Sequence, residues 1–291
     1  MIIVADSALQ LGYETIQSLG IEVVEYPMYL NGKPFPVSIS MSREEKDQLR
    51  LLLKDKDNKV TTSGLREKDL LEIYNKYKGE KIISLHQSGK ASTATAAVIK
   101  KVLKENTELD ITYIDAHHLT AGYSVIVQVA AEAVKNGNTF EDVVKLIEKS
   151  RTNTKHLGVV YDLFYLHRTG RIGLAKAILG TAMKIISILG SSEEPGVLKA
   201  IGKVKTSTQA NQRFIKIIKD DVDTKSGSRI KGVISVIGPH EKDAEHLKML
   251  VTKMGNESGI ITDFEIHYTN HSNMPHAGPD FYDIGYVVYG D

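Results

Sequence analysis

Residues 81–103 read KIISLHQSGKASTATAAVIKKVL, a short apolar run followed by a polar turn and a small-residue segment. The run at 81–86 is rich in β-branched and apolar residues, which favours a buried strand. After the turn, apolar residues recur at helical spacing. They are Ala94, Ala97, Val98 and Val102. The stretch therefore predicts a strand, a hydroxyl-rich turn at its carboxyl end, and a helix.

The same alternation of strand and helix continues on both sides of this unit. Ser42 with Glu45 predicts a capping box, and Thr139 with Asp142 predicts a second helix start. This rhythm is typical of a parallel sheet covered by helices. The expected strands are 2–4, 21–26, 81–86 and 111–115, and the expected helices lie near 8–19, 42–53, 94–102, 122–136 and 139–150.

The second half has a different pattern, with more strands between fewer helices. We predict a polar loop at 220–230 and a domain boundary near 151–154, giving domains 1–152 and 153–291. The expected strands are 157–161, 233–237, 260–268 and 284–289, with a hairpin around Gly202 (197–206) and helices at 174–188, 208–218 and 244–254.

Composition excludes several classes of protein. The 291 residues include no cysteine, so disulfides and cysteine-ligated metal sites are excluded. The net charge of +1 argues against nucleic acid as a partner. The apolar stretch 172–190 is interrupted by Lys176 and Lys184, so it is not expected to span a membrane. With no secretion signal expected, we predict a cytoplasmic protein that makes at most transient contact with a membrane surface.

The charge is distributed unevenly. Residues 151–205 hold nine Lys/Arg and three acidic residues, so this segment carries +6 and the remainder −5. A basic docking face and an ordinary mixture of solvated helix faces are both compatible with this distribution.

Familiar catalytic and nucleotide-binding signatures are missing from the sequence. There is no Gly-x-Ser-x-Gly, no Gly-x-Gly-x-x-Gly, no His-Glu-x-x-His and no P-loop. His267, His271 and His276 lie close in sequence but have no acidic residue at a metal-binding spacing. We therefore expect no metal and no cofactor.

Hydroxyl side chains gather where strands are expected to meet helices. Thr62 and Ser63 follow a charged loop, and Ser92 stands where a helix begins. Ligands of open α/β sheets bind beyond the carboxyl ends of strands, and the free N–H groups of a helix start suit an anion. The alternative, which this stretch alone favours, is that Ser92 is only a helix cap.

Two further elements can contact an oxyanion. His276 lies in a turn shaped by Pro275, Gly278 and Pro279, and Arg171 follows Gly170 in a glycine turn. A histidine held in this way can donate to a carboxylate or act as an acid or base, and an arginine can bind an oxyanion. A structural role in the turn is the alternative for His276, and Arg171 can equally cap the C-terminus of a neighbouring helix.

Taken together and in order, these motifs resemble the DegV family of bacterial fatty-acid-binding proteins. The likeness covers nearly the whole chain. It rests on Val4-Ala5-Asp6-Ser7, 21–28, Thr62-Ser63, Ser88 with Lys90 and Ser92, Asp115-Ala116, 161–172, Lys203-Val204-Lys205-Thr206 and His276-Ala277-Gly278-Pro279.

The resemblance implies a two-domain α/β fold, with a Rossmann-like parallel-sheet domain, a C-terminal α/β domain and a long-chain fatty acid between them. It implies that Thr62, Ser63, Ser92 and His276 contact the carboxylate, with Arg171 and Gly278 nearby. It also implies a non-catalytic carrier that presents the acid to a separate fatty acid kinase for acyl-phosphate formation and phospholipid synthesis. In the expected helix at 174–189, the candidates for the tunnel wall are Ile178, Leu179, Ala182 and Ile185.

Four departures from the family pattern are present. Ser92-Thr93-Ala94 replaces a Ser-Gly-Thr, Ile186-Ser187 replaces a Lys-Pro, Lys205 replaces an arginine, and Asp280 replaces a glycine. The changes at Ile186 and Lys205 affect the expected kinase interaction, and Asp280 puts a carboxylate near the expected acid site. The alternatives are a lipid-sensing paralogue without a kinase partner, an esterase or thioesterase that uses Ser92 with His276, and a regulator or scaffold that kept the fold and lost the ligand.

Overall fold

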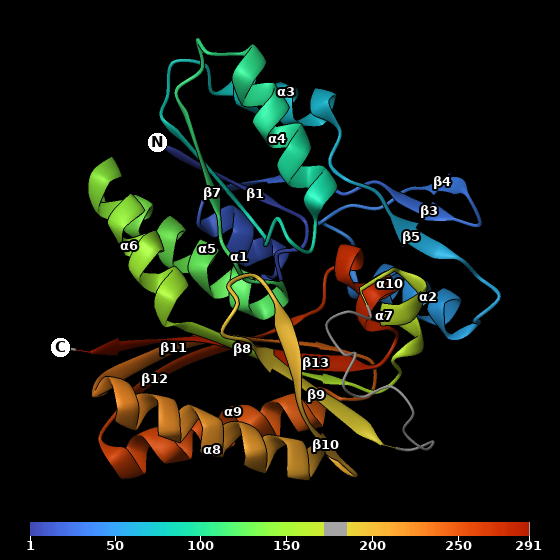
Figure 1. The fold of residues 1–291 in the computed structure, drawn as a ribbon, viewed down its shortest axis with the longest axis vertical. Helices are drawn as coiled ribbons and strands as arrows, with labels where there is room; N and C mark the ends of the chain where they lie inside the picture. The colour runs from blue at the N-terminus through green and yellow to red at the C-terminus, as the bar shows by residue number, and fades with distance from the viewer. Residues whose placement is uncertain (172–184, 291) are drawn as a thin grey trace.

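A computed structural model describes residues 1–171 and 185–290 of the chain. Helical and sheet layers alternate through the molecule (Figure 1). The first layers are built around a parallel four-stranded sheet in the order β2-β1-β6-β7, and the second around a six-stranded sheet in the order β10-β9-β8-β13-β11-β12. The molecule is therefore a two-domain α/β protein, as the sequence predicts.

Crossover connections that contain helices join the strands of the parallel sheet. Buried apolar runs form these strands, and residues Ile82–His86 of β6 are buried throughout. Helices α3 and α4 lie on one side of the sheet and α1, α5 and α6 on the other (Figure 1). The bounds are β1 Ile2–Asp6, β2 Ile21–Val24, β6 Ile82–His86, β7 Ile111–Asp115, α1 Tyr13–Ser18, α3 Glu67–Lys76, α4 Thr93–Glu105, α5 Thr120–Lys135 and α6 Phe140–Asn153.

A small antiparallel sheet and one helix extend from the first half of the chain. The order is β4-β3-β5, and β5 ends at Thr62, opposite Met28 of β3. The predicted capping box is present, because Ser42 accepts from Glu45 N–H while the Glu45 side chain accepts from Ser42 N–H. The bounds are β3 Met28–Leu30, β4 Lys33–Phe35, β5 Val60–Thr62 and α2 Arg43–Lys54.

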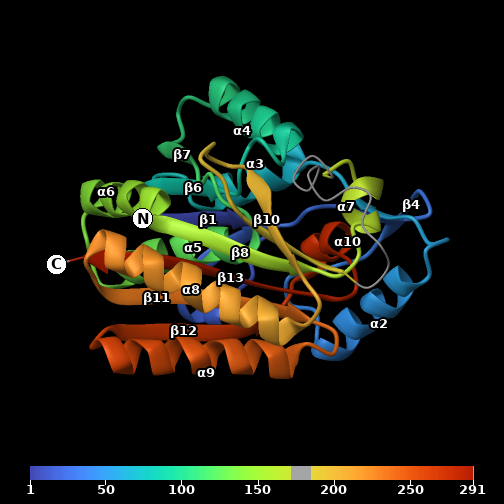
Figure 2. The same ribbon diagram turned by 60° about the horizontal axis from the view of Figure 1, so that its bottom comes forward.

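The six-stranded sheet is antiparallel except between β11 and β12. Helices α8 and α9 cover its outer face, and α5 contacts its inner face (Figure 2). The bounds are β8 Thr154–Val160, α7 Phe164–Arg168, β9 Ile186–Ser191, β10 Leu198–Val204, α8 Ser207–Lys225, β11 Gly227–Ile237, α9 Glu241–Ser258, β12 Ile261–Tyr268, η2 His271–Asn273, α10 Met274–Ala277 and β13 Phe281–Gly290.

Three predictions about local structure in the second half are wrong. The expected helix 174–188 cannot include its last residues, because Ile186–Ser191 form β9, while 172–184 lie outside the described residues. The expected hairpin at Gly202 is one continuous strand, β10, with a bulge between Ala200 and Gly202. The expected loop 220–230 continues α8 to Lys225 and then begins β11.

Each error has a physical reason. A short apolar run buried on both faces has no periodicity that separates strand from helix, and β9 lies between β8 and β10. The glycine at position 202 is needed for packing and not for a turn. A Cβ there would lie 2.6 Å from the Arg213 guanidinium. The polar residues at the end of α8 mostly face solvent, so they resemble loop composition. The helix ends at Ser226 in the left-handed conformation.

Candidate functional site

A cavity of about 310 Å³ lies between the two halves of the chain. This volume is at the small end of the range for small-molecule sites. The first half contributes residues at the ends of β5 and β6 and at the start of α4 and α5. The second half contributes β8, β9 and α10. The cavity thus lies beyond the carboxyl ends of parallel strands, as expected for an open α/β sheet.

His276 lies on the short helix α10, which begins with Met274 and Pro275. Its Nε2 is 3.0 Å from Thr62 Oγ1, and its Nδ1 is buried with no hydrogen-bond partner among the described residues. Burial, followed by the positive charge of Arg171, lowers the pKa of His276 to about 3. The imidazole is therefore neutral near pH 7 and carries one N–H that can donate to an acceptor.

The three predicted hydroxyl residues line the same cavity as His276. Ser63 is exposed, and its Oγ donates to the Gly64 carbonyl over 3.2 Å. Ser92 occupies the cap position of α4, but its side chain does not cap the helix. Its Oγ donates to Thr95 Oγ1 over 2.9 Å instead. The structure brings all four residues together, and their contact with a carboxylate stays a prediction.

Arg171 and Gly278 have different surroundings. Arg171 lines the cavity and donates to the Thr169 carbonyl. Gly278 ends α10 at φ +92°, and a Cβ there would lie 2.7 Å from the Tyr165 ring. Gly278 therefore allows the turn after His276 to pack on Tyr165, while Arg171 places a positive charge beside the cavity.

The predicted tunnel wall has a different composition in the described residues. Ile178, Leu179 and Ala182 lie outside them, and Ile185 is not among the described residues that line the cavity. Strands and short helices supply apolar walls that the sequence did not single out. These are Leu119, Val160, Leu166, Leu189, Leu198 and Phe281.

Asp280 does not line this cavity. Its carboxylate pairs with Arg50 over 2.9 Å, and Arg50 Nε donates to the Pro279 carbonyl over 2.8 Å. The aspartate that replaces a glycine of the family pattern is thus neutralised outside the cavity.

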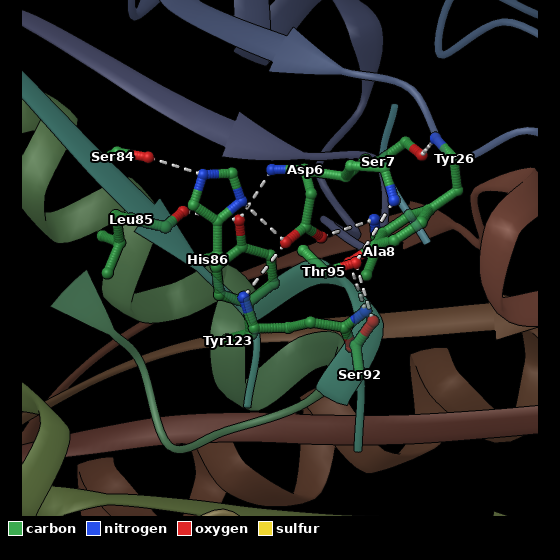
Figure 3. Close-up of polar contacts among 12 residues, drawn as sticks. Asp6, Ser7, Ala8, Tyr26, Ser84, Leu85, His86, Ser92, Thr95 and Tyr123 are labelled. Carbon is green, nitrogen blue, oxygen red and sulfur yellow. Dashed lines mark hydrogen bonds and ion pairs between the residues drawn. The ribbon is translucent and has the colours of Figure 1, made fainter. Parts of the chain in front are cut away.

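A buried hydrogen-bond chain that the sequence did not reveal runs beside the cavity (Figure 3). Ser84 Oγ lies 2.7 Å from His86 Nε2, and His86 Nδ1 lies 3.1 Å from Asp6 Oδ2. The order Ser–His–Asp resembles a catalytic triad. All three side chains are fully buried, however, and Ser84 is also bonded to Tyr74 OH over 2.7 Å. No substrate can reach this serine, so the chain is structural.

The same chain connects to the site through Gln87. Its N–H donates to Asp6 Oδ2 over 3.1 Å, and its side chain donates to Tyr26 OH over 3.0 Å. Tyr26 lies beside the hydroxyls of Ser92 and Thr95 (Figure 3). Burial, followed by the negative charge of Asp6, raises the pKa of Tyr26, so its hydroxyl keeps its proton. Asp6 and Gln87 therefore help to fix the polar end of the cavity.

A second set of buried hydrogen bonds joins the loop after β1 to the segment that carries His276. Asn270 Nδ2 donates to the Leu9 and Leu11 carbonyls, the latter over 3.1 Å. Asn273 Nδ2 donates to the Ala8 carbonyl over 2.8 Å. These side chains provide hydrogen-bond donors for the backbone carbonyls of a buried loop that has no secondary structure of its own.

The predicted Ser92–His276 pair lacks the contact that an esterase would need. The Ser92 hydroxyl bonds to Thr95, and the His276 ring contacts Thr62, so the two side chains do not hydrogen-bond each other. In the described parts of the chain, no three His, Asp or Glu side chains are grouped to hold a metal ion. None of the helices there is long and apolar enough to cross a membrane.

The family model described as "uncharacterised protein, DegV family" matches residues 1–288. The chain belongs to the DegV family. A DegV domain-containing protein of Staphylococcus aureus (strain COL) is 26% identical over 290 residues, covering 99% of this chain and 98% of that protein.

Solved DegV structures share the fold. A fatty-acid-binding DegV family protein of Thermus thermophilus superposes with a TM-score of 0.84 at 23% identity, covering 99% of both chains. DegV of Bacillus subtilis, a fatty acid binding protein, superposes with a TM-score of 0.82 at 20% identity, again over 99% of both chains. At these identities the likeness establishes the fold.

Two departures of this DegV chain from the family pattern lie apart from the cavity. Ile186 begins β9 and packs in the core of the six-stranded sheet, and Lys205 is exposed between β10 and α8. Neither residue lines the cavity.

Proposed function

We propose that this DegV protein binds a long-chain fatty acid in the cavity between its halves. The observation that carries the proposal is the composition of the wall. Thr62, Ser63, Ser92 and His276 supply polar groups, and leucine, valine and phenylalanine side chains supply apolar surface. An amphipathic ligand with a small polar head fits this arrangement.

The energetics favour such a ligand. Each buried CH₂ of an acyl chain contributes about 0.8 kcal/mol, so the apolar wall supplies most of the affinity. The carboxylate would be costly to desolvate without donors. Hydroxyls and the neutral imidazole of His276 can donate, and the Arg171 charge lies beside them. The fatty-acid-binding relatives of Thermus thermophilus and Bacillus subtilis support this assignment.

We further propose that the protein is a cytoplasmic, non-catalytic carrier that presents the acid to a separate fatty acid kinase, which makes the acyl phosphate used in phospholipid synthesis. The sequence contains no P-loop, and residues 151–205 carry a net charge of +6 that suits an acidic partner face. Weakening of the association by salt would support charge-driven docking, whereas salt-independent association would contradict it.

Native mass spectrometry of the purified chain tests the binding proposal directly. We expect a co-purified species with the mass of a fatty acid. In a delipidated sample, added oleate or palmitate should raise the melting temperature as ligand concentration exceeds the Kd. Failure to find any lipid, together with an unchanged melting temperature, would overturn the proposal.

A further inference from the structure

A second polar group lies in the cavity, apart from the proposed carboxylate site. Alternate residues His156, Gly158 and Val160 of β8 all line the cavity, so the cavity follows this strand. Val160 packs in the same cluster as Ala277 of α10, beside His276. At roughly 3.3 Å per residue, His156 lies about 13 Å further along β8. The wall there is polar, because Thr120 also lines it.

Thr120 and His156 are held by one buried carboxylate. Thr120 Oγ1 donates to Asp283 Oδ2, and His156 Nε2 lies 2.7 Å from the same oxygen. Thr120 Oγ1 is also 2.9 Å from His156 Nε2. Ala121 N–H donates to Asp283 Oδ2 over 3.2 Å, and Ser235 donates to its other oxygen. Both carboxylate oxygens of Asp283 therefore have hydrogen-bond partners within the protein.

The glycines of this region allow the close approach. A Cβ on Gly122 would lie 2.9 Å from His156 Cβ, and a Cβ on Gly285 would overlap the Ala121 backbone. The start of α5 therefore sits directly on β8 and β13. A Cβ on Gly158 would make only ordinary contacts, 3.4 Å from Asp283 Cβ and 3.8 Å from Phe281, and because Gly158 lines the cavity a bulkier side chain there would take up cavity space.

The group retains hydrogen-bonding capacity. The Thr120 hydroxyl donates to Asp283, which leaves an oxygen lone pair available. His156 is 2% exposed, and its Nδ1 has no hydrogen-bond partner among the described residues. Thr120 is held at φ +44°, a strained conformation for a β-branched residue. An acyl methyl group placed here would cover polar atoms without offering them a partner.

We propose that Thr120 and His156 form a subsite for a hydroxyl group on the acyl chain. This inference rests on the proposed function, because it assumes that the carboxylate lies at His276. A neutral hydroxyl fits better than a second carboxylate, which would meet the negative charge of Asp283. The ligand class is therefore a long-chain fatty acid hydroxylated in mid-chain.

The test compares stearic acid with 2-, 10- and 12-hydroxystearic acid by isothermal titration calorimetry on the delipidated full chain. We expect at least one mid-chain hydroxy acid to bind about five-fold tighter than stearic acid, the effect of roughly one net hydrogen bond. The 2-hydroxy acid, whose hydroxyl stays beside the carboxylate, should show no such preference.

Variants assign the preference to the subsite. In Thr120→Val, the ratio of the affinity for the mid-chain hydroxy acid to the affinity for stearic acid should fall close to one. His156→Leu is the second variant in case Thr120→Val fails to fold, and the ratio does not depend on the folded fraction. Gly158→Val should narrow the passage, so stearic acid and the mid-chain hydroxy acids should bind much more weakly than they bind to the wild type.

The outcomes separate the two proposals. If stearic acid binds and no mid-chain hydroxy acid binds more tightly, the subsite is refuted and fatty acid binding stands. The subsite is refuted in the same way if both Thr120→Val and His156→Leu keep the full preference. If none of the acids binds, the proposed function and the subsite fail together.

Discussion

At the scale of single residues, His276 should make stability depend on pH. Its pKa is lowered from 6.5 to about 3, mainly by burial and then by Arg171. Below about pH 6.5 the unfolded chain takes up a proton that the folded chain refuses. The free energy of unfolding should therefore fall as pH drops toward 3, by up to about 1.4 kcal/mol per pH unit from this group.

Urea denaturation between about pH 7 and pH 5 checks this expectation. His276→Gln should show a shallower fall than the wild type. Some dependence should remain, because burial also lowers the pKa of His118, to about 4. If the free energy of unfolding fell equally with pH in the two proteins, the pKa of His276 would not be lowered in the folded chain.

The proposed carboxylate ligands give a second prediction at this scale. His276→Ala and Ser92→Ala each remove a donor to a buried anion, so each should weaken palmitate binding by roughly ten-fold or more. Ser258→Ala, at the exposed end of α9, is the matched control and should bind normally. Unchanged affinity in both site variants would refute the placement of the carboxylate.

At the scale of elements, the segment that carries His276 depends on Asn270. This buried side chain donates to two carbonyls of the loop after β1 and accepts from Lys46 Nζ over 2.7 Å. Asn270→Ala leaves these groups unpaired. We expect the free energy of unfolding to fall by about 2–4 kcal/mol, and palmitate binding to weaken because α10 loses its anchor.

Chemical denaturation and calorimetry measure both effects. Asn256→Ala on the exposed face of α9 should change neither quantity. If Asn270→Ala were as stable as this control, the polar contacts of the loop would not hold α10 in place.

Elements with a clear sequence pattern were predictable, and contacts distant in sequence were not. The parallel strands and the caps at Ser42 and Thr139 follow from local patterns, and both caps are present. Thr62, Ser92 and His276 could be selected as polar residues in turns, but only the fold brings residues 214 positions apart into contact. The sequence pattern mistook β9 for helix because a doubly buried strand has the same apolar run as a helix.

The Thr120–His156–Asp283 group could not be predicted from the sequence for the same reason. Its members lie on α5, β8 and β13, and none belongs to a recognisable motif. Gly122 and Gly158 are the local features of this region that the sequence displays. Their role in close packing can be recognised only when the fold shows which residues lie against them.

At the scale of the molecule, the β9–β10 connection reaches across to the first half. Ser88 Oγ donates to the Gly196 carbonyl over 2.8 Å, and Lys90 pairs with Glu194 over 2.7 Å. Leu198, just beyond this contact, lines the cavity. Gly196 has φ +79°, and a Cβ there would overlap Ser88 Oγ. Gly196→Ala should push this connection away and speed ligand release several-fold.

Stopped-flow displacement of a fluorescent fatty acid measures this rate. Gly79→Ala is the matched control, since Gly79 has φ +94° but no atom within 4 Å of the added Cβ. An equal release rate in the two variants would mean that the connection does not control exit from the cavity.

Helix α5 couples the unfolding of the two halves. Of its 16 residues, 12 are buried, and it contacts β1 of one sheet and β11 and β13 of the other. Val233 and Val287 from the second half also belong to the core of the first. If either half unfolded, the apolar residues on one side of this helix would become exposed to water. Differential scanning calorimetry should therefore record a single cooperative transition, and a chain truncated after residue 152 should aggregate rather than fold alone.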